Sequence, residues 1–261
     1  MPVLGLGTSP LNDAETERIV AAALDVGYRL IDTAENYRNE AGVGRGIRAS
    51  GIDRDEVFVT TKLNKRWHGY EEAQQAWSNS AERLGLDRID LLLIHWPNPQ
   101  QNRYVDAWRG MVQLLEDGKV RAIGVSNFKP AHLDRLVDET GITPHVNQIE
   151  LDPRISRREE RAYHEAHDIV TESWSPLGAG GGLLREPAIG EIAERHGRTP
   201  AQIVLRWHVQ LGLVAIPRTS KHERLSENLD VFDFALTDEE MERLAELDGR
   251  DRVTDSDRFG H

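Results

Sequence analysis

The stretch "AETERIVAAALDVGYRLIDT", residues 14–33, contains one unit of the fold that we predict for the whole chain. Apolar residues at helical spacing, from Ile19 to Val26, predict an amphipathic helix in its first part. Gly27 follows, at the place where a left-handed residue commonly ends a helix. A short apolar segment then ends on Asp32, and its composition is typical of a buried strand. The stretch therefore has the order helix, glycine, strand.

The same order recurs along the chain. Eight short segments are predicted as strands, and most are nearly continuous apolar runs, which are typical of parallel strands covered on both faces. They are VLGLG (3–7), RLIDT (29–33), VFVTTK (57–62), DLLLIH (90–95), AIGVSN (122–127), HVNQIE (145–150), IVTESW (169–174) and LVAIP (213–217). The glycines placed to end the helices between them are Gly27, Gly51, Gly85, Gly118, Gly141 and Gly212. This pattern predicts an α/β fold, a single (β/α)8 TIM barrel domain over residues 1–261, with a doubly wound sheet as the alternative.

Composition limits the function classes that need to be considered. The 261 residues include no cysteine, which excludes disulfides, thiolate nucleophiles and zinc–thiolate sites, and we expect no bound metal. The formal net charge of −12 argues against nucleic-acid binding, which needs a basic surface. No apolar run reaches membrane-spanning length, and the first residues do not resemble a signal peptide. We expect a cytoplasmic monomer with a small molecule as its partner.

Four ionisable side chains are predicted to meet at one end of the barrel. Asp32, Lys62 and His95 each end a predicted strand, and Tyr37 lies in the turn after the second strand. In this fold the chemistry gathers at the C-terminal ends of the strands. Any one such residue is more often a structural group than a catalyst. A lysine at the end of a buried strand is costly, however, unless a carboxylate compensates its charge, and Asp32 is the candidate. The set of four therefore predicts an active site.

A phenol beside an ammonium group is a candidate proton donor. An unperturbed phenol has a pKa of about 10 and is a poor acid at neutral pH. We expect the Lys62 ammonium to lower the pKa of Tyr37, because it stabilises the phenolate. Asp32 would hold Lys62 charged and in place, and His95 would orient a substrate oxygen by hydrogen bonding. The arrangement predicts proton donation to a carbonyl oxygen.

The glycines at 42, 44 and 46 invite a different interpretation, that of a nucleotide-binding loop. Their spacing is G-x-G-x-G, whereas the dinucleotide-binding loop has G-x-G-x-x-G directly after a strand. We expect these glycines to allow close packing of a helix instead.

Seven segments, in order along the chain, resemble those of one family. They are "LIDTAENY", "TTKL", "LLLIHWP", "IGVSNF", "NQIEL", "SWSPLG" and "IPRTSKHERLSENLDVFDF". Together they resemble the aldo-keto reductases, and among them most closely the bacterial 2,5-diketo-D-gluconic acid reductases. The resemblance implies NADPH-dependent reduction of aldehydes or ketones, such as dicarbonyls or keto-sugar acids, to alcohols.

The resemblance also implies roles for individual residues. Asp32, Tyr37, Lys62 and His95 match the family's catalytic tetrad, with Tyr37 as the general acid. Trp174 matches the aromatic residue on which the nicotinamide ring stacks, although a tryptophan at a strand end is also commonly core packing. "SPLG" matches the segment over the pyrophosphate, and the following "AGGG" would let that loop open and close. Ser126, Asn127 and Gln148 match residues that hydrogen-bond the nicotinamide carboxamide. Ser175 and Leu177 match contacts of the pyrophosphate segment, and Thr8 matches a further cofactor contact.

The segment from 216 to 228 resembles the family's site for the adenosine 2′-phosphate. Arg218 stands where lysine is usual, and Thr219 stands where serine is usual. Arg224 matches an arginine near the adenine and the 2′-phosphate, while Glu227 and Asn228 match polar contacts at that end. The start of a solvated helix is the alternative explanation, but cations gathered in so acidic a chain favour an anion site.

The chain departs from the family at several positions. Ser9 and Asn64 stand where aromatic residues commonly wall the substrate pocket, which predicts a wider and more polar pocket shared with Trp96. Asp152 replaces a usual histidine, with no consequence that the sequence reveals. The short β-hairpin that usually precedes the first strand is expected to be absent, since Met1 falls almost on that strand.

Two other functions remain open at this point. A barrel with a lysine at a strand end is also compatible with a Schiff-base lyase that uses Lys62 as its nucleophile. A sensor that binds NADPH without catalysis is the second alternative, and the presence of all four tetrad residues argues against it.

Overall fold

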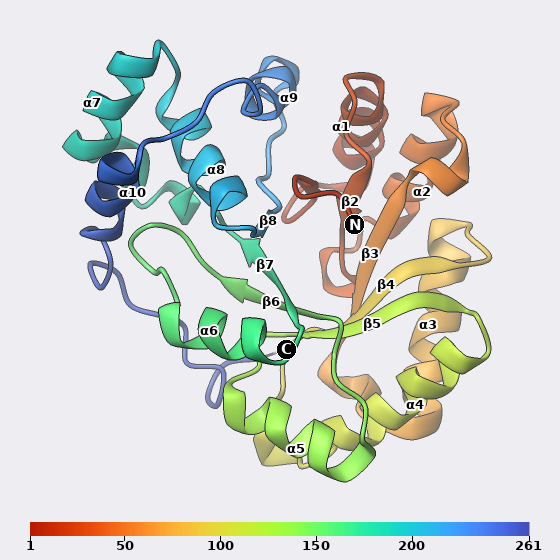
Figure 1. Cartoon of the computed structure of the whole chain (residues 1–261). Helices are drawn as coiled ribbons and strands as arrows, with labels where there is room; N and C mark the ends of the chain where they lie inside the picture. Colours follow the sequence, from red (N-terminus) through yellow and green to blue (C-terminus); the bar gives the residue numbers. More distant parts are fainter. Residues whose placement is uncertain (261) are drawn as a thin grey trace.

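Eight parallel strands form one sheet in the computed structural model, which describes residues 1–260. Their order in the sheet is their order in the chain. The first and last strands are also joined, because Gly5 N–H donates to the Ala215 carbonyl at 2.9 Å and Gly7 N–H donates to the Pro217 carbonyl at 3.1 Å. The sheet therefore closes into the predicted barrel (Figure 1). The strands are β1 (Leu6–Gly7), β2 (Leu30–Asp32), β3 (Phe58–Leu63), β4 (Ile89–Ile94), β5 (Val120–Ser126), β6 (Val146–Glu150), β7 (Val170–Trp174) and β8 (Val214–Ala215).

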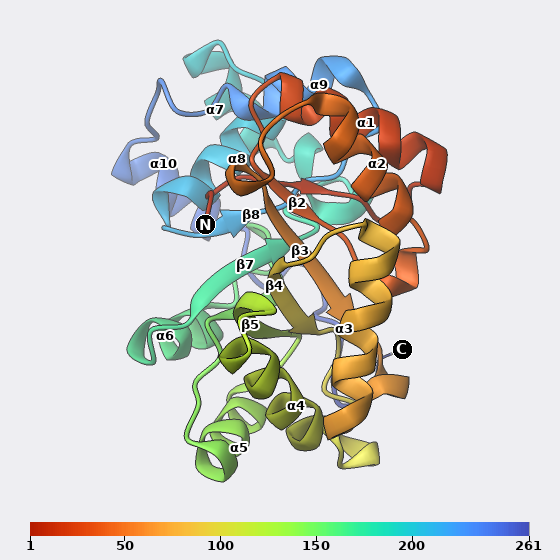
Figure 2. The same cartoon turned by 90° about the vertical axis from the view of Figure 1, so that its right-hand side faces the viewer.

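The helices lie outside the barrel, and Figure 2 shows α1, α2 and α3 along one flank. They are α1 (Asp13–Asp25), α2 (Glu40–Ser50), α3 (Tyr70–Leu84), α4 (Tyr104–Glu116), α5 (Pro130–Thr140), α6 (Arg158–Ala166), α7 (Pro187–His196), α8 (Pro200–Gln210), α9 (His222–Leu229) and α10 (Asp238–Ala245). The six glycines predicted to end helices all have positive φ, between 67° and 111°. That prediction is confirmed, and the left-handed conformation explains why glycine stands there. No helix of the described chain is long and apolar enough to cross a membrane.

The three closely spaced glycines of α2 serve helix packing, as expected. A Cβ atom at Gly42 would collide with the Asp13 carbonyl of α1, and one at Gly44 would collide with the Leu84 carbonyl at the end of α3. Without side chains at these positions, α2 approaches both neighbours closely enough for backbone contact. The nucleotide-loop interpretation therefore finds no support in the fold.

The interior of the barrel changes from apolar to polar along its axis. Two small clusters of buried apolar side chains come from the strands. They include Leu30, Leu91, Val146 and Val214. Nearer the C-terminal ends, the interior side chains are charged or amide groups. The site described below is built on this polar layer.

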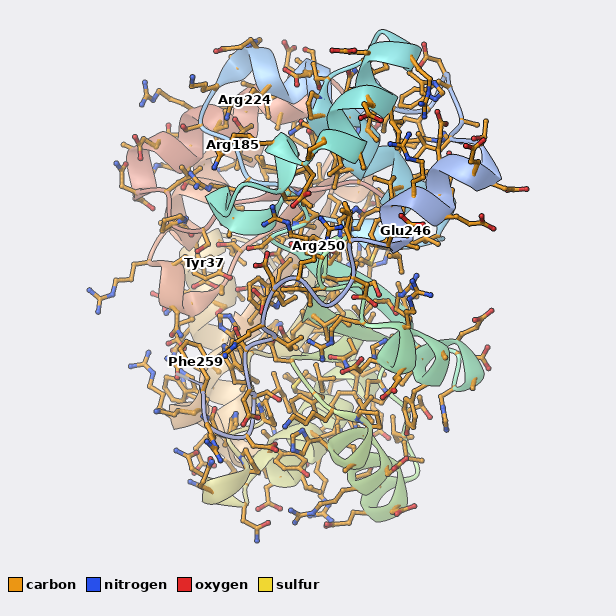
Figure 3. All side chains as sticks on the ribbon, turned by 90° about the vertical axis from the view of Figure 1, so that its left-hand side faces the viewer. Tyr37, Arg185, Arg224, Glu246, Arg250 and Phe259 are labelled. Atoms are coloured by element: carbon orange, nitrogen blue, oxygen red, sulfur yellow. The ribbon has the colours of Figure 1, made fainter. Side chains whose placement is uncertain are left out.

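The chain after α10 crosses the mouth of the barrel. Residues 248–260, called the C-terminal tail here, run from near Arg250 to Phe259 along the face shown in Figure 3. The first strand of the described residues is β1, and no hairpin precedes it in them.

Candidate active site

A cavity of about 710 Å³ opens at the C-terminal ends of the strands. Most of the residues predicted for the site line it, but Lys62 lies behind Asp32, and four others also lie outside the lining. Those four are Asn64, Thr219, Glu227 and Asn228. The predicted residues that line the cavity are Thr8, Ser9, Asp32, Tyr37, His95, Trp96, Ser126, Asn127, Gln148, Trp174, Ser175, Leu177, Arg218 and Arg224.

Asp32 and Lys62 form a buried ion pair at the floor of the cavity. The Lys62 ammonium donates to both Asp32 carboxylate oxygens, at 2.6 and 2.8 Å, and to the Thr33 carbonyl at 2.9 Å. Burial would lower the pKa of Lys62, but the charge of the Asp32 carboxylate and its hydrogen bonds to the ammonium raise it above its usual value. The three donors of the ammonium are thus all used, and Lys62 is held as a cation.

Gln148 and Glu172 extend this pair across the barrel. The Gln148 amide nitrogen donates to Asp32 Oδ2 at 2.9 Å and to Glu172 Oε2 at 2.9 Å. The strand register places Gln148 of β6 directly beside Glu172 of β7. The motif "NQIEL" made Gln148 a candidate, but Glu172 was missed. Its signal in the sequence was an acidic residue inside the apolar strand segment "IVTESW".

Tyr37 lies between the ion pair and His95. The Lys62 ammonium is 5.3 Å from the centroid of the Tyr37 ring, and the His95 ring centroid is 5.8 Å away in an edge-to-face arrangement. Burial raises the pKa of Tyr37, and the lowering by the Lys62 charge does not offset it. The predicted net lowering is therefore wrong, because desolvation of the phenolate outweighs the attraction of the ammonium. The phenol is protonated at neutral pH, as a proton donor must be.

Two buried polar residues fix the turn that carries Tyr37. Asn39 donates to the Thr8 and Leu11 carbonyls, both at 3.0 Å, and so ties the turn to the segment after β1. Glu40 accepts from Thr61 Oγ1 of β3 at 2.6 Å. Both residues lie in the run "RNEAG", for which the sequence predicts a packing role for Gly42 alone.

A second hydrogen-bonded group lines the cavity next to His95. Asn127, in the left-handed region with φ of 65°, donates to the His95 carbonyl at 3.1 Å and to Ser126 Oγ at 2.9 Å. Its side-chain oxygen accepts from the Trp174 indole N–H at 2.9 Å. This contact holds the edge of the Trp174 ring, while the ring itself lines the cavity.

Three arginines line the cavity without a carboxylate partner. Arg185, Arg218 and Arg224 have no carboxylate oxygen within 4.0 Å in residues 1–260, whereas Arg198 pairs with Asp230. Figure 3 shows Arg185 and Arg224 at one end of this face, with Tyr37 and Phe259 further along it. Arg185 was not predicted, although it follows the glycine run after "SPLG". The arginines make this end of the cavity suited to an anion.

The other residues predicted for the adenosine end make contacts within the protein. Glu227 Oε1 accepts from Thr199 Oγ1 at 2.7 Å, and Asn228 is buried beside the Tyr28 phenol. The Thr219 hydroxyl accepts from the Lys221 N–H at 3.0 Å. These side chains therefore shape the backbone of the segment, and the structure does not place them against the cavity.

The rim of the cavity is completed by the C-terminal tail. The Phe259 ring packs edge to face on Trp96, with 4.8 Å between the ring centroids, and both line the cavity. Asn64 does not line it, because its amide donates to Asn36. The tail was missed as a part of the site, since "DRVTDSDRFG" has no periodic pattern. The predicted widening at Ser9 and Asn64 is thus opposed by Phe259.

Asp152, whose role was open, shapes a turn near the tail. Its carboxylate accepts from the Arg154 N–H at 2.7 Å. The Arg154 side chain in turn pairs with Glu186 at 2.6 Å and with Asp251 of the tail at 3.2 Å. Burial, first of all, raises the pKa of Asp152 to about 6. Asp152 therefore positions the arginine that connects the loop after β7 to the tail.

The chain is similar to known proteins over nearly its whole length. Residues 3–249 match the model of the Aldo/keto reductase family. An aldo-keto reductase of Mycobacterium avium (strain 104) is 53% identical over 97% of this chain and 88% of its own length. The 2,5-diketo-D-gluconic acid reductase B of Corynebacterium sp. (strain SHS752001) is 51% identical over 98% of this chain and 92% of its own length. A crystal structure of a Gox0644 mutant in complex with NADPH has 45% sequence identity to this chain and a TM-score of 0.95. The match covers 100% of this chain and 95% of the chain in that structure.

Proposed function

Because this chain belongs to the aldo-keto reductase family, whose members are NADPH-dependent oxidoreductases, we propose that it reduces a small aldehyde or ketone to an alcohol with the proton supplied by Tyr37. One observation carries the assignment of the site. The protonated Tyr37 phenol faces the cavity directly above a buried Asp32–Lys62 pair, next to His95. A proton donor, a fixed positive charge and a hydrogen-bonding imidazole are what carbonyl reduction requires of the protein.

The residues of the cavity fit NADPH. Three arginines without carboxylate partners, Arg185, Arg218 and Arg224, offer positive charge for its phosphates at one end. At the other end Gln148, Asn127 and Trp174 offer polar atoms and an aromatic face for the nicotinamide. When bound, NADPH supplies the hydride. Ser175 and Leu177 line the cavity between these ends, where we propose that they cover the pyrophosphate.

The side chains of this protein would then perform the proton transfer. His95 orients the substrate carbonyl oxygen toward the Tyr37 hydroxyl. Tyr37 donates its proton to that oxygen, so that a new O–H bond forms as the carbonyl carbon is reduced. The phenolate that remains is stabilised by the Lys62 charge and regains a proton from solvent. Asp32 keeps Lys62 in place throughout.

The substrate class follows from the walls of the cavity. Ser9 supplies a polar surface on one side, and Trp96 with Phe259 supplies an aromatic one on the other. A small carbonyl compound with hydroxyl or carboxylate groups, such as a dicarbonyl or a keto-sugar acid, fits both. The similarity to a relative named 2,5-diketo-D-gluconic acid reductase B supports this choice.

A panel of carbonyl compounds, followed by NADPH absorbance, tests the proposal. We expect turnover with small dicarbonyls or keto-sugar acids, faster than with bulky aromatic ketones. If no carbonyl compound oxidises NADPH while NADPH still binds, the sensor alternative is correct. Trapping of a covalent substrate adduct by borohydride would instead support a lyase that uses Lys62.

A further inference from the structure

Glu172 is a buried carboxyl group that the proposed mechanism does not use. It lies in the middle of β7, between Gln148 of β6 and Val214 of β8, and its side chain is fully buried. Glu172 Oε2 accepts from the Gln148 amide at 2.9 Å, while Glu172 Oε1 has no hydrogen-bond partner within the described chain. A buried carboxyl with an unsatisfied oxygen costs folding free energy, and an apolar side chain of similar volume would avoid that cost. Its contact with Gln148 is therefore the feature that needs explaining.

The contact fixes the orientation of the Gln148 amide. An amide NH₂ group has two hydrogens to donate, and Gln148 donates them to Asp32 and Glu172. If the amide were rotated by half a turn, its carbonyl oxygen would face the Asp32 carboxylate, which cannot donate, and the N–H hydrogen bonds to Asp32 and Glu172 would be lost. The Gln148 carbonyl oxygen is consequently the polar atom of this side chain that remains for a ligand in the cavity, which Gln148 lines.

Burial and the neighbouring Asp32 carboxylate favour the neutral form of Glu172. Asp32 and Lys62 are the charged groups that face it, and both are buried. Burial, followed by repulsion from the Asp32 carboxylate, raises the pKa of Glu172 to about 8, although the Gln148 hydrogen bond and the Lys62 charge lower it. A protonated carboxyl can still accept from Gln148 through Oε2. Ionisation would place a second negative charge beside Asp32.

We propose that Glu172 is a positioning residue for the nicotinamide: by accepting from the Gln148 amide, it keeps the Gln148 carbonyl oxygen turned toward the cofactor's carboxamide N–H. The inference rests on the proposed function, because it requires NADPH to occupy the cavity. It assigns to Glu172 an effect on cofactor affinity and on substrate reduction that acts only through Gln148.

Two variants with opposite hydrogen-bonding ability test this role. Glu172→Gln keeps an oxygen that can accept from Gln148, so we expect the Kd for NADPH to stay within about threefold of the unmutated value. Glu172→Leu removes the acceptor and keeps a similar volume. We expect it to raise the Kd by about tenfold, and equally for NADPH and NADH, because both carry the nicotinamide. Fluorescence titration with each cofactor measures these constants, and circular dichroism confirms that the variants are folded.

A double-mutant cycle shows whether the effect passes through Gln148. In a Gln148→Leu background, Glu172→Leu should change the Kd by less than about twofold, since the side chain that it positions is already gone. If Glu172→Leu raises the Kd for NADPH by the same factor in the Gln148→Leu background as in the unmutated background, the proposal is overturned. An unchanged Kd in folded Glu172→Leu would overturn it as well.

The conservative variant provides a readout that a merely structural role would not affect. Ionised Glu172 accepts from Gln148 at least as well as the neutral carboxyl does, so the Kd for NADPH should not rise through loss of this hydrogen bond as the pH passes through about 8. A Kd raised by about tenfold in folded Glu172→Gln would contradict the role of Glu172, even if Glu172→Leu does not fold. These are binding measurements, so a failure of the proposed carbonyl reduction would be seen separately, as cofactor binding without turnover.

Discussion

Two ion pairs of this protein have the same length and very different surroundings. Lys62 and Asp32, at the floor of the cavity, are 2.6 Å apart, and their side chains are 0% and 3% exposed. Lys129 and Asp257, which attach the C-terminal tail at the rim, are also 2.6 Å apart, but their side chains are 38% and 46% exposed. Distance alone therefore does not determine what an ion pair contributes. Water and salt weaken the pair at the rim, whereas the pair at the floor is shielded from both.

The difference suits the two positions. In the proposed mechanism the floor must hold one lysine in one place while a proton leaves the phenol above it, so a buried pair with every donor satisfied is appropriate. The tail rests on the rim through exposed pairs of Lys129 with Asp255 and Asp257, together with the packing of Phe259 on Trp96. Exposed pairs of this kind are individually weak. We therefore expect the contacts of the tail to be broken more easily than those of the floor.

The largest expected effect comes from removing the proton donor above the floor. Tyr37→Phe should lower kcat by roughly 10²–10⁴-fold, or more, because the general acid is lost. The Kd for NADPH should be nearly unchanged, since the phenol is not expected to hold the cofactor. Steady-state kinetics on a good aldehyde and a fluorescence titration measure the two quantities. Near-normal turnover in Tyr37→Phe would show that another group donates the proton.

Breaking the floor pair should damage both activity and stability. Lys62→Met leaves the buried Asp32 carboxylate without its partner, which typically costs about 3–5 kcal/mol of unfolding free energy. We expect kcat to fall by at least about a hundredfold, because the charge beside Tyr37 is lost. In the control, Asp32→Asn combined with Lys62→Met, stability should largely return while activity does not. Urea unfolding and kinetics distinguish the two effects, and a double variant as unstable as Lys62→Met would contradict the pairing argument.

The contrast between floor and rim also separates what could be predicted from the sequence and what could not. Asp32, Lys62 and His95 were predictable because parallel strands in a barrel end at the same face. Glu172 was not predictable, because the register of β7 decides whether a side chain in the middle of the strand points into the barrel or out of it. One sequence does not reveal that register. The C-terminal tail was also unpredictable, since its place is set by scattered contacts such as Phe259 on Trp96.

The pKa shift of Tyr37 was also only partly predictable from the sequence. Its neighbour Lys62 was predictable, and so was the sign of the ammonium's effect. The net shift depends on how deeply the phenol is buried, and that depth is a property of the assembled cavity. Proximity of charge could be inferred from strand order, but the desolvation that opposes it could not.

An intermediate effect is expected at the end of the cavity with the three arginines, which are exposed and are proposed to bind the phosphates of NADPH. Arg224→Ala should weaken NADPH binding by about ten- to a hundredfold and NADH binding much less, because only NADPH carries the 2′-phosphate. Added salt should narrow the difference between the cofactors. Arg18→Ala, which removes an exposed arginine of α1 far from the cavity lining, is the matched control. Equal losses for both cofactors would place Arg224 on the pyrophosphate instead of the 2′-phosphate.

The smallest effect is expected from the rim pair. Lys129→Met removes the two ion pairs that Lys129 makes with the tail, so the tail should be held less firmly over the cavity. With saturating NADPH, we expect the KM for substrate to change by about threefold or less and kcat to stay nearly constant, because exposed pairs contribute little.

In the unmutated protein, salt near 1 M should move the KM toward that of the variant, since the Debye length falls to about 3 Å. The same salt should not reproduce the loss of kcat expected for Lys62→Met, because solvent ions do not reach the buried floor. If Lys129→Met lowers kcat as strongly as Lys62→Met does, the rim takes part in the chemistry, and exposure is not what distinguishes the two pairs.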